Sequence, residues 1–139
     1  MLLENIIKKH LLLLERDNYI STLKDNITID FELFKKDHVI VRQKRHQYET
    51  EGPCAGEIIS NFDIVNLVED SLNIVSIEIV NHNIRNGKEF IVSREGDDFL
   101  NLVIIPLNTG ERKWNLIVKT LMCKQNFTVG KGQLQLYIP

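Results

Sequence analysis

Cys54 is the residue best placed for nucleophilic chemistry, because it lies in the Gly- and Pro-containing stretch 52–56 just ahead of a predicted helix. The N-terminus of a helix stabilises a thiolate, which is the reactive form of cysteine. A nucleophile also requires a histidine partner, and neither His46 nor His82 stands at a spacing that identifies an enzyme family. Isolated cysteines are usually small apolar residues, so we interpret Cys54 as a half-buried loop thiol.

A second candidate for catalysis combines Asp98 with Glu111 and Lys113. Metal-dependent nucleases place an acid on one strand and an acid-x-Lys sequence on the next, where they bind Mg²⁺ and orient the attacking water. Here Glu111 directly follows the turn residues 109–110 and so lies outside the strand that this arrangement requires. We therefore interpret these charges as solvated turn residues, and the sequence does not favour an enzyme.

Metal and cofactor sites are not indicated either. The four histidines are too scattered along the chain to predict a metal site: His10, His38, His46 and His82. Gly130 and Gly132 lie between two predicted strands, without the helix N-terminus that a phosphate-binding loop uses. The prediction is no metal and no cofactor.

The strongest surface feature is a basic run with an aromatic residue, made of Arg42, Lys44, Arg45, His46 and Tyr48. Clustered cations bind phosphates or acidic protein groups, and an aromatic ring beside them can stack on a base. Residues 49–70 contain acids but no Lys or Arg, so the run can equally be a solvated loop that its neighbours neutralise. A similar polar tip is predicted at His82 and Arg85.

Composition places the chain among ordinary globular proteins. It has 139 residues, 43% hydrophobic and 26% charged, which suits one domain over residues 1–139. The net charge of -2 and the pI of about 6.1 argue against a general nucleic-acid or membrane coat, which needs a strongly basic surface.

Cysteine usage and the N-terminal residues predict the compartment. Cys54 and Cys123 could pair, but one pair without a secretory signal is not a disulfide framework. The apolar run 11–14 is too short for a signal peptide or a membrane span. We expect reduced thiols and a cytoplasmic protein. A single alanine, Ala55, beside abundant Ile, Asn and Lys is typical of AT-rich coding in a bacterium, phage or virus.

The first half of the chain is predicted to contain a helix, a hairpin and a second helix. Residues 1–24 form the N-terminal helical segment, because apolar residues recur at helical spacing. Residues 26–43 form a hairpin, in which 27–33 alternate strictly and 38–42 make a shorter second strand. A long polar loop over 43–56 leads to a helix over 57–70.

The second half, residues 73–138, is predicted to be about five antiparallel strands. Asn86-Gly87 favours a two-residue hairpin turn, because both of its central positions need positive φ. The predicted strands are 73–81, 88–93, 98–106, 113–123 and 133–138. Two of them, 98–106 and 113–123, are apolar on both faces and should be central. A second copy of the chain could cover the face that the helices leave open, which predicts a homodimer through the sheet.

These elements define an α+β fold whose order is similar to that of the NTF2-like cone, where helices and a small hairpin pack into the concave side of a curved sheet. Residues 23–31 (LKDNITIDF) and 52–62 (GPCAGEIISNF) resemble that family's first strand and third helix, with one predicted strand more than the family has. The resemblance implies a curved antiparallel meander. A β-sandwich with an N-terminal helix is the alternative architecture.

The function that these patterns favour is a small, non-catalytic binding protein of the immunity, inhibitor or accessory type. It would contact an acidic surface of another protein through the basic run. One alternative is a small-molecule-binding or enzymatic domain with a pocket on the concave face, near Trp114, Tyr137 and Tyr19, with Asp30 or His38 as polar contacts. The second alternative is a nucleic-acid binder that uses residues 42–48.

Overall fold

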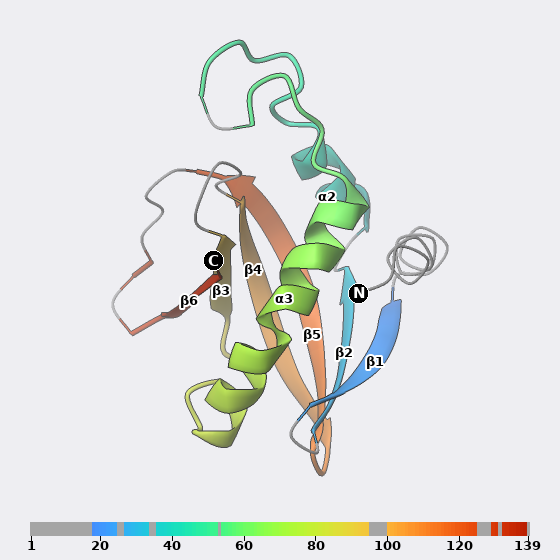
Figure 1. The fold of residues 1–139 in the computed structure, drawn as a ribbon, viewed down its shortest axis with the longest axis vertical. Coiled ribbons are helices and arrows are strands. Elements are labelled where there is room, and N and C mark those ends of the chain that lie inside the picture. The colour runs from blue at the N-terminus through green and yellow to red at the C-terminus, as the bar shows by residue number, and fades with distance from the viewer. Residues whose placement is uncertain are drawn as a thin grey trace.

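A computed structural model describes residues 18–24, 27–33, 36–52, 54–94, 100–124, 129–130 and 132–138. The fold is α+β (Figure 1). Along the chain the elements are β1 (Asn18–Lys24), β2 (Ile27–Leu33), α2 (Lys36–Gln43), α3 (Asn61–Val80), β3 (Phe90–Arg94), β4 (Leu100–Gly110), β5 (Lys113–Cys123) and β6 (Leu134–Ile138). No helix in these described ranges is long and apolar enough to cross a membrane.

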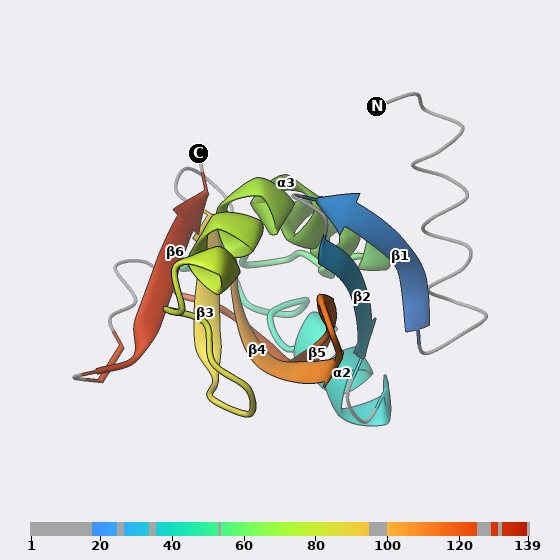
Figure 2. The ribbon, with the colours of Figure 1, turned by 90° about the horizontal axis from the view of Figure 1, so that it is seen from below.

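The strands form one mixed sheet in the order β1-β2-β5-β4-β3-β6. Two neighbouring pairs are parallel, β2 with β5 and β3 with β6, and the other pairs are antiparallel. Figure 2 shows the sheet curving around α3, which lies in its concave side. The predicted antiparallel meander is therefore confirmed for β3, β4 and β5 but is wrong for β6, which pairs in parallel with β3.

One apolar core joins α3 to the concave face of the sheet. The buried residues of α3 follow helical spacing through Ile64, Val68, Leu72, Val75 and Ile79. They meet inward-facing strand residues that alternate along each strand, among them Phe90, Val92, Leu102, Ile104, Leu116 and Val118. β4 and β5 occupy the centre of the sheet, as their apolar sequences predict.

The opposite face of the sheet holds a buried polar network. Ser93 Oγ donates to Asn101 Oδ1 at 2.6 Å, and Gln135 Nε2 donates to Ser93 Oγ at 2.9 Å. Asn101 Nδ2 also donates to the main-chain oxygens of Met122 and Lys124, at 3.3 and 3.1 Å. The network joins β3, β4 and β6 to the end of β5, and it satisfies polar groups that would be costly to bury alone.

Helix α3 begins and ends at identifiable capping residues. Ser60 Oγ accepts from the Asp63 main-chain N–H at 3.1 Å, and Asp63 Oδ2 accepts from the Ser60 N–H at 3.0 Å, which is a capping box. The helix then continues to Val80, without an intervening Gly or Pro to end it. It stops where His82 adopts a positive φ of 62° and Ile84 is buried.

The predicted helix over 57–70 is confirmed from residue 61 onward, but the predicted strand over 73–81 is wrong, because α3 continues through it to Val80. Val75, Ile77 and Ile79 alternate and so resemble a strand, but only Val75 and Ile79 face the core. Ile77 is left 51% exposed. The helical stripe that starts at Ile64 continues through this segment, because burying it against the sheet outweighs the local β-propensity of Ile and Val.

The predicted hairpin over 26–43 is half right. Residues 27–33 form strand β2, but residues 38–42 lie in helix α2, which packs against β5. The antiparallel partner of β2 is β1, whose residues were predicted to end a helix. β2 needs a neighbour on each edge, and β1 and β5 provide them. The N-terminal helix predicted over residues 1–17 lies outside the described residues.

The Asn86-Gly87 turn is confirmed, but it follows a helix rather than a strand. The Lys88 N–H donates to the Arg85 oxygen at 3.1 Å, and only Gly87 of the two central residues has positive φ, at 78°. This pattern fits a type II turn rather than the type I′ turn of a tight hairpin. The Gly87 N–H donates to Pro106 O at 2.7 Å, so the turn is attached to β4.

We expect Gly87→Val to lower the free energy of unfolding by about 1–2 kcal/mol, because a β-branched residue resists positive φ. No atom lies within 4 Å of a Cβ placed there, so the effect arises from the backbone alone. Urea denaturation of the variant and of Gly87→Asn measures it. Asn tolerates the left-handed region, and equal stability of the two variants would contradict this explanation.

His82→Gly is expected to raise the free energy of unfolding by about 1 kcal/mol, because glycine adopts the left-handed helix-end conformation without a Cβ penalty. Thermal or urea unfolding provides the measurement. Asn81→Gly, at the preceding exposed position with a φ of −81°, is the matched control and should give no gain. If His82→Gly is no more stable than the wild-type protein, the positive φ of His82 does not destabilise the fold.

Candidate functional site

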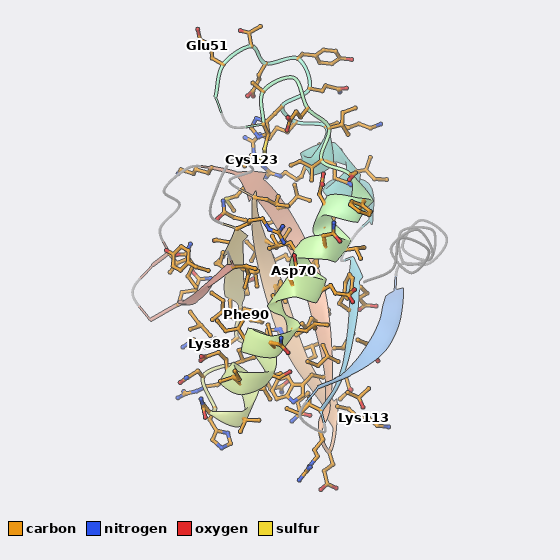
Figure 3. The ribbon with its side chains drawn as sticks, viewed as in Figure 1. Glu51, Asp70, Lys88, Phe90, Lys113 and Cys123 are labelled. Carbon is orange, nitrogen blue, oxygen red and sulfur yellow. A yellow bond between two sulfur atoms is a disulfide. The ribbon has the colours of Figure 1, made fainter. Side chains whose placement is uncertain are left out.

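The candidate site is the segment between α2 and α3, residues 44–58, which we call the projecting loop. It extends beyond the end of the sheet (Figure 1). Glu51 marks its outer part and Cys123 lies near its base (Figure 3). The loop contains most of the basic run predicted as a binding surface, and Arg42 precedes it in the last turn of α2.

A pair of reciprocal hydrogen bonds closes the base of the projecting loop. The Ile59 N–H donates to the main-chain oxygen of Gln43 at 2.9 Å, and Gln43 Nε2 donates to the Ile59 oxygen at 2.8 Å. Gln43 is only 7% exposed, and its buried amide is satisfied by this contact. The chain therefore leaves and re-enters the body of the protein at adjacent points.

Further hydrogen bonds fold the loop on itself. The Gly56 N–H donates to the His46 oxygen at 2.8 Å, which bridges the two sides of the loop. The His46 Nδ1 and Glu49 Oε2 atoms lie 2.7 Å apart. A compact segment of this length with close ends is an Ω-type loop, a class that is frequently functional. The long polar loop expected from the sequence is thus an ordered structure.

Cys54 and Cys123 form a disulfide that attaches the projecting loop to the last residue of β5. This corrects the expectation of reduced thiols and leaves no free cysteine for nucleophilic chemistry. The cysteines are 69 residues apart, and closing a loop of that size stabilises a fold by about 4 kcal/mol in the chain-entropy account. Disulfides persist in oxidising compartments, so the thiol argument for a cytoplasmic protein no longer holds.

The surface of the projecting loop combines apolar and charged side chains. Tyr48 is 90% exposed and Ile58 is 54% exposed, while Val41 on the adjoining α2 is 67% exposed. Lys44 and Arg45 are also exposed. Large apolar side chains held in solvent on an ordered loop are typical of a contact surface, since folding alone does not require them there.

The loop is less basic than its sequence suggests. Residues 42–58 contain three cations, Arg42, Lys44 and Arg45, and three carboxylates, Glu49, Glu51 and Glu57, so their formal charges cancel. All three acids are exposed on the projecting loop. A neutral surface lacks the excess positive charge that binds a phosphate backbone.

His82 and Arg85 do not join this surface. They follow the C-terminal end of α3, whereas the projecting loop precedes its N-terminal end. The helix has 20 residues, which corresponds to about 30 Å between its ends. The Arg85 side chain instead donates to the main-chain oxygen of His82 at 3.4 Å. The two predicted polar surfaces are therefore separate.

The residues named for a concave pocket are also dispersed. α3 fills the concave side of the sheet, where Trp114 packs against the core, and Tyr137 is 49% exposed on β6. Asp30 alternates with the inward-facing Ile29 and Phe31, so it lies on the other face of β2. The structure does not describe the side chains of Tyr19 and His38.

Asp98 and Glu111 are the remaining candidates for chemistry. Glu111 occupies the exposed turn between β4 and β5, as expected of a solvated turn charge, and Asp98 lies outside the described residues. Within the described part of the chain, no three His, Cys, Asp or Glu side chains gather as a metal site would require. An open, shallow hollow of about 510 Å³ is lined by Gly87, Lys88, Glu89, Gly132 and Gln133.

Comparisons with protein-family models, with curated proteins and with solved structures find no match for this chain. The site is therefore defined by its geometry alone. Sequence reasoning found Tyr48, the cations and the acidic stretch that neutralises them, but it missed Ile58 and Val41. The available signal was the pair Gly52 and Gly56, whose positive φ values of 99° and 76° reverse the chain on either side of Cys54.

Proposed function

We propose that this protein is a non-catalytic binding module of the immunity, inhibitor or accessory type, and that it engages a partner protein through the projecting loop. The observation that carries the proposal is Tyr48, 90% exposed on a loop that hydrogen bonds and a disulfide hold in place. Tyrosine is enriched among the residues that dominate binding energy, and a preorganised loop loses little entropy on binding.

The chemistry of the loop indicates what kind of partner it fits. Tyr48 and Ile58 would bind an apolar pocket on the partner. The exposed Lys44 and Arg45 favour acidic groups beside that pocket. His46 lies against Glu49 within the loop, so it is less available to a partner than the sequence suggests. The balanced charge of residues 42–58 supports a protein partner over a nucleic acid.

Tyr48→Ala is expected to weaken partner binding by about 2 kcal/mol or more, roughly thirtyfold in Kd, while the fold is unchanged. The partner is first captured from source-cell lysate with the immobilised wild-type protein, identified by mass spectrometry, and then titrated in purified form by calorimetry. Nuclease treatment of the lysate distinguishes a protein from a nucleic acid.

The matched control is Tyr137→Ala, which removes another exposed tyrosine, 49% accessible on β6. It should leave the Kd within twofold of wild type. Equal affinities for the two alanine variants would refute the projecting loop as the contact surface. Loss of binding in Tyr137→Ala alone would place the interface on the sheet edge instead.

Lys44→Glu combined with Arg45→Glu is expected to slow association with the same partner by roughly tenfold and to reduce its dependence on salt, because exposed charges act mainly on the encounter rate. Surface plasmon resonance at two salt concentrations measures both effects. Arg85→Glu with Lys88→Glu, an equal charge change beyond the other end of α3, is the control. Faster association of the loop variant would mean that the partner surface is not acidic.

A further inference from the structure

We propose that the Cys54–Cys123 disulfide is a redox latch that controls the order of the projecting loop and, through it, the binding surface. The control of binding rests on the proposed function, whereas the control of loop order does not. The disulfide joins the loop to the core directly, because Cys123 is 8% exposed at the end of β5 and Cys54 packs against the same core.

The other contacts described for the loop lie at its base or within it. The Gln43–Ile59 hydrogen bonds close the base, and the bond from Gly56 to His46 joins one side of the loop to the other. None of these three contacts attaches the outer part of the loop to the sheet. The disulfide therefore supplies a fixed point between the loop and β5 that these hydrogen bonds do not replace.

The backbone around Cys54 adds a second, independent observation. Gly52, Cys54 and Gly56 have positive φ values of 99°, 61° and 76°. Glycine adopts this region freely, but Cys54 carries a Cβ and is disfavoured there. A non-glycine residue keeps such a conformation when its surroundings fix it. Here the bond to Cys123 acts beside two turn hydrogen bonds, from the Ala55 N–H to the Gly52 oxygen at 3.2 Å and from the Glu57 N–H to the Cys54 oxygen at 3.0 Å. Breaking the disulfide removes the covalent one of these restraints and makes it easier for Cys54 to relax toward negative φ.

Reduction by a dithiol follows ordinary thiol–disulfide exchange. A thiolate of the reductant attacks Sγ of Cys54, the more exposed of the two cysteines, and Cys123 leaves as a thiolate that takes up a proton. The second thiol of the reductant then attacks the mixed disulfide and releases Cys54, which is protonated in turn. The protein gains two electrons and two protons, and the dithiol becomes a cyclic disulfide.

Residue-resolved hydrogen exchange by NMR, with and without dithiothreitol, tests the latch on the isolated protein. We expect the Gly56 amide, which donates to His46, to exchange at least tenfold faster after reduction. Amides of the central strand β4 exchange through global unfolding, which the loss of the disulfide also makes easier, so they should exchange faster than before but remain at least tenfold slower than Gly56. Cys54→Ser with Cys123→Ser should reproduce the reduced state, and dithiothreitol should have no effect on that variant.

Unchanged Gly56 exchange, with both thiols shown to be free by mass spectrometry, would overturn the latch. If Gly56 and the β4 amides exchange at the same rate after reduction, the measurement is repeated in the His82→Gly background, where the fold is more stable. Equal rates there as well would also overturn the proposal, because Gly56 would then open only when the whole domain unfolds.

Binding to the captured partner separates this inference from the proposed function. Binding that weakens at least tenfold on reduction, in step with faster Gly56 exchange, supports redox control. Equal binding of both redox forms would overturn that control and leave the proposed function standing. If Tyr48→Ala and Tyr137→Ala bind equally well while Gly56 exchange still depends on reduction, the proposed function fails and the latch on loop order remains.

Discussion

The packing of α3 into the concave side of the sheet is the contact on which the rest of the structure depends. A single helical stripe from Ile64 to Ile79 meets the inward-facing residues of the sheet and forms one continuous core. Because this helix fills the concave side, the segments that precede and follow it must leave from opposite ends of the molecule. The projecting loop emerges at one end, and the segment that follows α3 leaves from the other (Figure 1). An ion pair between Arg94 and Asp70, at 2.6 Å, adds a polar contact between α3 and β3.

The sheet combines parallel and antiparallel strand pairs, and side-chain hydrogen bonds stabilise this arrangement around β3. β3 has an antiparallel neighbour, β4, on one edge and a parallel neighbour, β6, on the other. The hydrogen bonds among Ser93, Asn101 and Gln135 link all three strands on the face opposite α3. A shift of β6 by one residue would bury the wrong side chains and separate Gln135 from Ser93, so the network favours one register.

The same architecture explains why the candidate site is a loop rather than a pocket. With α3 in the concave side, the apolar residues that remain in solvent at the loop end are Tyr48, Ile58 and Val41. A short polar segment has no hydrophobic core of its own to stabilise it. Hydrogen bonds at the base of the loop and a disulfide to β5 hold it in place instead. A projecting, preorganised loop is suited to insertion into a concave surface on a partner.

The sequence by itself determined the elements whose local period is unambiguous. Strict alternation located β2, apolar runs on both faces identified β4 and β5 as central strands, and Asn86-Gly87 located a turn. Residues 73–80 were wrongly predicted as a strand, because strand-like alternation there coincides with the end of a long helical stripe. Residues 36–43 and 18–24 were also assigned wrongly, because their short patterns fit either a helix or a strand.

In the candidate site, the sequence identified the cations and Tyr48, because these residues are consecutive or nearly so. Only the tertiary structure decided that Val41 and Ile58 stay exposed, that Cys54 meets Cys123 from 69 residues away, and that β6 lies beside β3. Local periodicity is set by neighbours in the chain, whereas pairing and burial depend on contacts between distant residues.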